Sequence, residues 1–153
     1  FGWQNNFTWK NWDFSFFFRG TIGNKVLNNP RAAYANNTYL IGTNALDDEL
    51  TYTMKESSRV CSYYLENGSF IRLDNLALGY TFDTKKINWL DKARLYFAAQ
   101  NLFVITGYKG LDPEVELFRG ESSDTDAGLS PGIEPRQFFP KARTFTLGVN
   151  LTF

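Results

Sequence analysis

Strict alternation of apolar and polar residues is the feature that most limits what this chain can fold into. In the segment 141–153 the positions alternate between two sets, which are Phe145, Leu147, Val149, Leu151 and Phe153 on one side and Thr144, Thr146, Gly148, Asn150 and Thr152 on the other. A period of two places such sets on opposite faces of a β-strand. Similar alternation recurs at about 3–9, 12–22, 70–82 and 93–105. The sequence therefore predicts an all-β fold of five antiparallel strands.

Three positions interrupt the alternation. Asn5 and Asn101 fall among the apolar residues of their segments, and the phase slips near Asp74, because Ile71 and Leu73 lie out of register with the apolar residues that follow. One extra residue in a strand causes such a slip. The sequence thus predicts a β-bulge near Asp74.

Strand length and the placement of charge favour a membrane-spanning sheet. Thirteen residues in extended conformation rise roughly 43 Å, which at a tilt near 45° spans about 30 Å of bilayer hydrocarbon. The segments 76–82, 95–105 and 144–153 contain no charged residue, although 21% of the chain is charged. A water-facing sheet surface usually carries charges. A barrel wall with lipid on one side and a lumen on the other accounts for their absence.

The connections between the predicted strands differ in length at the two ends. They are short at 10–11 and 83–92 and long at about 23–69 and 106–139. Outer-membrane barrels have short periplasmic turns and longer extracellular loops. Several aromatic residues gather at the short-turn end, as in the girdle at a membrane interface, namely Trp9, Trp12, Phe82, Trp89 and Phe153. The alternative is a soluble β-sandwich, such as a carbohydrate-binding module, with these rings in its core.

Five strands are too few to close a membrane barrel, since bacterial barrels have an even number of at least about eight. We therefore expect residues 1–153 to form the C-terminal part of a longer barrel, with 23–69 and 106–139 as extracellular loops. The remaining barrel strands would lie outside this sequence.

Four sequence blocks resemble one family of transporters. Ser69–Tyr80 (SFIRLDNLALGY) resembles the SFLRLKNLTLGY strand of SusC/RagA-like TonB-dependent outer-membrane transporters, and Arg94–Phe103 (RLYFAAQNLF) resembles their RVYVSGQNLF strand. Tyr108–Glu114 (YKGLDPE) is similar to their YKGLDPE loop. Ala142–Phe153 (ARTFTLGVNLTF) resembles their terminal PRTFTFGVNLTF. The first predicted hairpin, WKNWDFSFFFRGTIGNKVLN, resembles their YKGFDLSFFFQGSYGNKVYN.

The resemblance implies a 22-stranded barrel with an N-terminal plug domain, a SusD/RagB-like surface lipoprotein as a lid, and energy supplied by TonB through the N-terminal region. Such transporters import oligosaccharides or peptides across the outer membrane. The resemblance leaves open which substrate is carried and whether two complexes of transporter and lipoprotein form a dimer. Plug and TonB-binding region would lie outside this sequence.

Composition argues against catalysis. The chain has no His and a single Cys, Cys61, which excludes Ser-His-Asp and Cys-His catalysis and His-ligated metals. Sixteen basic residues balance sixteen acidic ones, so net charge gives no reason to expect nucleic acid as a partner. We expect no enzyme activity, no cofactor and no metal. The acidic residues Asp47, Asp48, Asp112 and Glu114 are interpreted as loop residues rather than a paired-carboxylate site.

Two sets of residues are candidates for a role in transport or assembly. Tyrosine offers a ring for stacking and a polar hydroxyl, so Tyr63, Tyr64 and Tyr108 are candidate substrate contacts together with the lumen-facing Arg94. Asp13, Arg19 and Arg94 are expected to pair with neighbouring strands or with the plug. The alternating apolar residues that end in Phe153 resemble the terminal signal read by the barrel-assembly machinery, and comprise Phe145, Leu147, Val149, Leu151 and Phe153.

Overall fold

The computed structural model describes residues 1–35, 42, 44, 46–48, 62–84, 89–115, 132–136 and 139–153. The chain divides into two compact units. The sheet unit comprises Phe1–Thr21, Phe70–Ile105 and Lys141–Phe153, and the loop unit comprises Ile22–Ser69 and Thr106–Pro140. Within the described part of the chain, no helix combines the length and the apolar character needed to cross a membrane.

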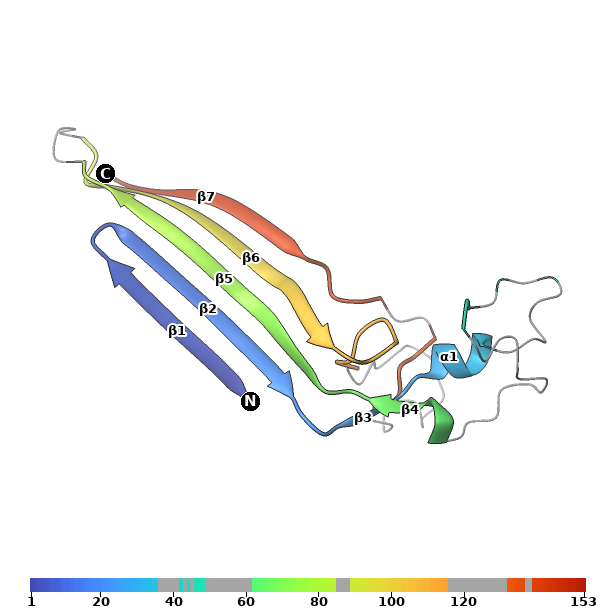
Figure 1. Ribbon diagram of the computed structural model, residues 1–153. Coiled ribbons are helices and arrows are strands. Elements are labelled where there is room, and N and C mark those ends of the chain that lie inside the picture. Colours follow the sequence, from blue (N-terminus) through green and yellow to red (C-terminus); the bar gives the residue numbers. More distant parts are fainter. Residues whose placement is uncertain are drawn as a thin grey trace, which may run out of the picture. The chain divides into compact units, whose positions relative to one another are not determined.

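One five-stranded sheet forms the sheet unit (Figure 1). Its strands are β1 (Gly2–Trp9), β2 (Trp12–Thr21), β5 (Phe70–Phe82), β6 (Lys92–Thr106) and β7 (Thr144–Thr152), in the spatial order β1-β2-β5-β6-β7. The pairs β1–β2, β2–β5 and β6–β7 are antiparallel. The predicted all-β fold is thus confirmed, with each predicted strand in place. Outside this sheet the described residues form only one further sheet of two short strands, which is too small to be the second layer of the sandwich alternative.

The two faces of the sheet differ as the alternation predicts. Phe14 lies opposite Phe7 on one side and Leu78 on the other, and Leu147 lies opposite Phe97, so one apolar face runs across all five strands. This face is open: Phe7 is 54% exposed and Leu147 is 73% exposed. An exposed apolar surface of this extent marks contact with a partner or a membrane.

The predicted bulge lies where the sequence placed it. The partner of Phe17 is Asn75, whereas the partner of the next residue, Phe18, is Leu73, so Asp74 is the extra residue of β5. The bulge keeps Leu73 on the apolar face and lets the Asp74 carboxylate pair with Arg19, at 3.1 Å from Nε to Oδ2. A carboxylate is thereby kept off a surface where its desolvation would be costly.

Asn101, the other predicted interruption, has a structural role in β6. Its φ of 55° lies in the left-handed region, which Asn adopts more readily than most residues. Its Oδ1 accepts a hydrogen bond from the buried Arg72, and its Nδ2 donates to the carbonyl of Lys141 at 2.6 Å. Asn101 therefore ties β5 and β6 to the segment that enters β7.

The polar face carries an ion pair that crosses a strand. Arg94 on β6 reaches over β5 to Asp13 on β2, with 2.9 Å between Nε and Oδ1. Gly79 of β5 lies beneath, and a Cβ there would be 2.5 Å from both the Asp13 carboxylate and the Arg94 guanidinium. Beside the pair, the guanidinium of Arg94 lies 5.4 Å from the ring centre of Tyr96. The expected pairing of Arg94 and Asp13 with neighbouring strands is confirmed.

The loop unit contains short elements that the sequence did not predict. Strand β3 (Lys25–Leu27) pairs with β4 (Leu65–Asn67), helix α1 spans Asn29–Tyr34, and a 3-10 turn, η2, spans Ser62–Tyr64. The side chain of Asn28 accepts a hydrogen bond from the backbone N–H of Arg31 at 2.9 Å, which caps the helix. The small core of this unit consists of Ala32, Ala35 and Tyr64, with Leu27 packed against it.

Candidate functional site

The two long predicted loops meet within the loop unit. The amide of Leu27 donates to the carbonyl of Gly132 at 2.7 Å, and the amide of Glu134 donates to the carbonyl of Leu27 at 3.0 Å. Leu27 and Ile133 thus form a parallel bridge. Residues from 23–69 and 106–139 are therefore brought together within one unit.

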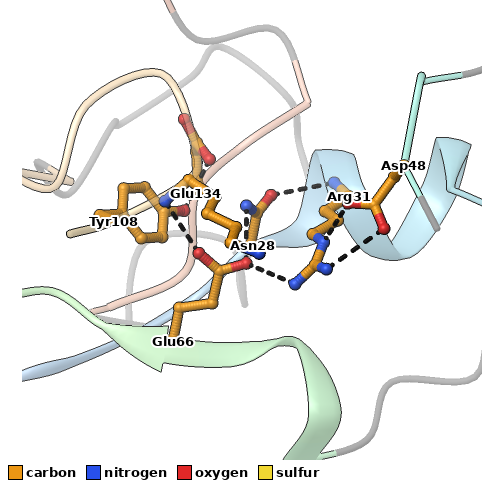
Figure 2. Close-up of polar contacts among 7 residues, drawn as sticks. Asn28, Arg31, Asp48, Glu66, Tyr108 and Glu134 are labelled. Carbon is orange, nitrogen blue, oxygen red and sulfur yellow. Dashed lines mark hydrogen bonds and ion pairs between the residues drawn. The ribbon is translucent and has the colours of Figure 1, made fainter. Parts of the chain in front are cut away.

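Glu66 on β4 joins three parts of this unit (Figure 2). Its Oε1 accepts from Asn28 Nδ2 at 3.2 Å and from Arg31 Nη1 at 3.0 Å, while its Oε2 accepts from the backbone amide of Lys109 at 2.9 Å. Arg31 also donates from Nε to Asp48 Oδ2 at 2.7 Å. The hydrogen bond that Arg31 donates to Asp48, and then the one that it donates to Glu66, raise the pKa of Arg31 above its ordinary value despite partial burial. Arg31 therefore remains a fixed cation between two carboxylates.

Glu134 is fully buried and occupies the other side of the cluster. Its Oε2 accepts from the Tyr108 hydroxyl at 2.7 Å, and its Oε1 accepts from the backbone amide of Leu111 at 2.8 Å. The chain passes so close at Gly110 that a Cβ there would lie 2.3 Å from Glu134 Oε2. Glycine at position 110 is thus required for the 108–111 segment to wrap around the Glu134 carboxylate.

Burial, reinforced by the hydrogen bond to Glu134, raises the pKa of Tyr108 well above its ordinary value. A raised pKa in the folded state means that this stabilisation is complete below the unfolded pKa of about 10 and is lost as pH rises beyond it. We therefore expect the 108–111 segment to open above about pH 10, measured as faster hydrogen exchange of the Leu111 amide. In Tyr108→Phe this component of the pH dependence should be absent; an identical profile in both proteins would contradict the assignment.

A pocket of about 640 Å³ opens beside this cluster. Leu46 and Leu111 contribute apolar surface, Asp47 and Lys109 contribute charge, and the buried Glu134 also lines it. Its volume falls within the range of roughly 300–1,000 Å³ that is typical of small-molecule sites. The loop unit therefore offers a cavity with a polar side and an aliphatic side.

The predicted substrate contacts differ in exposure and belong to two different units. Tyr63 is 59% exposed, and the guanidinium of Arg31 lies 6.0 Å from its ring centre. Tyr64 and Tyr108 are buried, so their rings offer little surface to a ligand. Arg94 belongs to the sheet unit, whereas the three tyrosines belong to the loop unit. Cys61 lies outside the described residues.

Several residues of the cluster were not singled out by the sequence. Asp48 lies in a loop as interpreted, but its ion pair with Arg31 was not foreseen. Asp112 and Glu114 are held within their own loop, where the Glu114 amide donates to Asp112 Oδ1 at 2.9 Å. Of these local structures, only the start of helix α1 could have been predicted from the sequence, since Asn at the cap and Pro in the first turn are typical of a helix N-terminus. The remaining residues that were missed are Asn28, Arg31, Glu66 and Glu134.

The predicted assembly residues lie together on the apolar face of β7 and just after it. The structure shows them all exposed: Phe145, Leu147, Val149, Leu151 and Phe153. Exposure is compatible with lipid contact as well as with recognition during assembly. Their role as an assembly signal stays a prediction.

Comparison with known proteins adds independent support for the predicted family. No protein-family model matches the chain. TonB-dependent receptor P3 of Formosa agariphila is 33% identical over 166 residues, covering 99% of this chain and 16% of the receptor. TonB-dependent receptor SusC of Bacteroides thetaiotaomicron is 31% identical over 166 residues, covering 99% of this chain and 15% of that receptor.

Solved structures show the same relationship. The RagAB peptide transporter matches with a TM-score of 0.72 and 26% identity, covering 99% of this chain and 17% of that chain. The chain thus spans between 15% and 17% of the length of these relatives. The predicted resemblance is confirmed over essentially the whole chain, in both sequence and fold. Sequence and structure therefore show that this chain, which corresponds to one part of a full-length receptor, belongs to the SusC/RagA-like family of TonB-dependent outer-membrane receptors.

Proposed function

We propose that this chain forms the C-terminal strands and two extracellular loops of the barrel of a TonB-dependent importer of oligosaccharides or peptides. The observation that carries the proposal is the two-faced sheet. One face presents apolar side chains across all five strands, while the other presents small and polar residues with the Asp13–Arg94 pair. A wall between lipid and a wet or plugged lumen needs these two faces.

The remaining parts of such an importer follow from the family. A complete barrel would have 22 strands, an N-terminal plug in its lumen and a TonB-binding region. A SusD/RagB-like surface lipoprotein would cover the extracellular side, and the RagAB name of the structural neighbour supports a two-protein assembly. Transport rather than catalysis is the proposed activity, since the relatives carry the names of receptors and transporters.

Uptake in the native host tests the import function. Cells lacking the gene for the full-length receptor should lose growth on one oligosaccharide or peptide source in a panel, and cells lacking TonB should lose growth on the same source. The gene with an intact TonB-binding region should restore growth. Unchanged growth on every source, or growth that is independent of TonB, would contradict the proposal.

The lipid-facing surface can be tested by one charged substitution in the full-length receptor. Leu147→Arg places a cation on the apolar face of β7, which should cost about 2–4 kcal/mol near the bilayer midplane. We expect much less folded receptor in the outer membrane, measured by the shift in gel mobility between unheated and heated samples.

Thr146→Arg is the matched control for Leu147→Arg. It introduces the same charge one residue earlier, on the polar face, where Thr146 lies opposite Ala98. We expect insertion close to that of the unchanged receptor. Equal loss in the two variants would mean that the apolar face of β7 does not contact lipid.

A further inference from the structure

Arg143 lies at one end of the column of apolar side chains on β7. That column runs from Phe145 to Phe153 without a charged residue. Continued by one position before Thr144, the first residue of β7, the same alternation places Arg143 on the side of Phe145. Phe145 is 59% exposed, and Arg143 is exposed as well. A cation therefore stands where the apolar surface of β7 ends, at the end of the strand that follows the long connection 106–139.

The backbone that leads to Arg143 has a fixed path. Asn101 donates from Nδ2 to the carbonyl oxygens of Lys141 at 2.6 Å and Ala142 at 3.2 Å. The Oδ1 atom of Asn101 accepts in turn from the buried Arg72. The two residues before Arg143 are thus held by side chains of β5 and β6, outside the β-ladder. The Arg143 side chain therefore starts from a defined position at the edge of the sheet.

The sheet unit leaves Arg143 without an anionic partner. The four acidic side chains of this unit are Asp13, Asp74, Asp83 and Asp91. The first two form the ion pairs with Arg94 and Arg19 described above. The other two flank the short connection 83–92, at the opposite end of the strands. Among the residues that the structure describes, none forms a hydrogen bond or an ion pair with the Arg143 guanidinium.

From these observations we propose that Arg143 binds a phosphate group of the glycolipid in the outer leaflet of the outer membrane, while the acyl chains of that lipid lie along Phe145 and Leu147. A guanidinium can form two parallel hydrogen bonds to a phosphate. The apolar stem of arginine packs on hydrocarbon while its charge reaches the head group. The proposal rests on the proposed position of the sheet in the membrane, with its long connections outside, and names a lipid that the sheet selects.

Lipid binding to the purified full-length receptor in detergent tests the phosphate contact. Native mass spectrometry gives the affinity for lipid A and for dephosphorylated lipid A, which has the same acyl chains without the phosphates. We expect the unchanged receptor to bind lipid A about five- to tenfold more tightly than the dephosphorylated form. Arg143→Gln should bind the two lipids with nearly equal affinity. Arg143→Lys should retain part of the preference, because it keeps the charge and loses the planar fork.

Lys10→Gln is the matched control. Lys10 is an exposed cation in the turn between β1 and β2, at the opposite end of the sheet, where its Nζ lies 5.0 Å from the ring centre of Trp9. This substitution changes the net charge as much as Arg143→Gln does, but it should leave the preference for lipid A unchanged. Equal losses in the two variants would show that the preference depends on overall charge, and they would overturn the contact at Arg143.

The lipids that co-purify with the receptor from outer membranes identify the source of the phosphate. Extracts of Arg143→Gln in mild detergent should contain less lipid A per receptor and the same amount of phospholipid. Unchanged lipid A content, or loss of phospholipid or of an associated protein instead, would overturn the assignment to the glycolipid. A preference for lipid A that survives in Arg143→Gln, or that is absent from the unchanged receptor, would overturn it as well.

The failure of this inference can be told apart from failure of the proposed function. TonB-dependent growth tests the import function independently of any lipid. The comparison of Leu147→Arg with Thr146→Arg tests whether the apolar face contacts lipid at all, whatever the head group. Loss of insertion in Leu147→Arg alone, together with equal binding of the two forms of lipid A, would leave the membrane wall standing and remove only the phosphate contact.

Discussion

Replacing Gly20 by alanine should prevent most of the full-length receptor from folding in the outer membrane. Gly20 is buried and lies opposite Ile71 in the β2–β5 pairing. A Cβ at this position would be 2.2 Å from the carbonyl oxygen of Phe70, which is a backbone atom fixed by the neighbouring Thr21–Phe70 pair. Because the oxygen cannot rotate away, the two strands would have to separate. We expect a cost of more than about 3 kcal/mol, above the usual range for overpacking.

Gly107→Ala is the control for Gly20→Ala. The same methyl group at position 107 would meet no atom within 4 Å. The heat-dependent gel shift of outer-membrane fractions gives the folded fraction of each variant, and urea midpoints give the difference in stability. Comparable folded fractions for the two variants would show that β2 and β5 are not packed as closely as the structure has them.

The sheet could be predicted from the sequence because its period is strict and its faces differ in chemistry. The segment 70–82 was predicted with the bounds that β5 has, and the slip at Asp74 identified the bulge. The last strand is shorter than predicted, since β7 begins at Thr144 rather than at residue 141. Residues 141 and 142 instead offer carbonyl oxygens to Asn101, which holds them outside the ladder.

The site could not be predicted in the same way. Glu66, Arg31 and Glu134 are far apart in the sequence, and no periodic pattern connects them. Their association depends on the pairing of β3 with β4 and on the bridge between Leu27 and Ile133, which involve very few residues. Short pairings of this kind follow from tertiary contacts rather than from local preference.

The tyrosines show why residue type alone was a poor guide to the site. Tyr63 and Tyr64 are adjacent in the sequence, yet the first is exposed and the second belongs to the core of the loop unit. Tyr108 uses its hydroxyl to satisfy Glu134 instead of presenting its ring. Tyrosine combines a large apolar body with one polar tip, so it serves a buried network as well as a binding surface.

Replacing Glu134 by leucine should open the loop unit while leaving the sheet folded. The change leaves the Tyr108 hydroxyl and the Leu111 amide without their acceptor in a buried position. Each unsatisfied donor costs about 1–3 kcal/mol, so the loss for the pair is about 2–6 kcal/mol. Hydrogen exchange of the Leu111 amide should become much faster, and the segments 23–69 and 106–139, if extracellular as proposed, should become more sensitive to protease added to intact cells.

Glu134→Gln separates the loss of hydrogen bonding from the loss of charge. Glutamine keeps one acceptor oxygen in a side chain of nearly the same shape, so one of the two donors can remain satisfied. We expect an exchange rate for Leu111 between those of the unchanged receptor and the leucine variant. The gel shift should be the same in all three proteins, because the hydrogen bonds of the Glu134 carboxylate with Tyr108 and Leu111 lie within the loop unit. Exchange in Glu134→Leu at the rate of the unchanged receptor would show that this carboxylate does not hold the 108–111 segment in place.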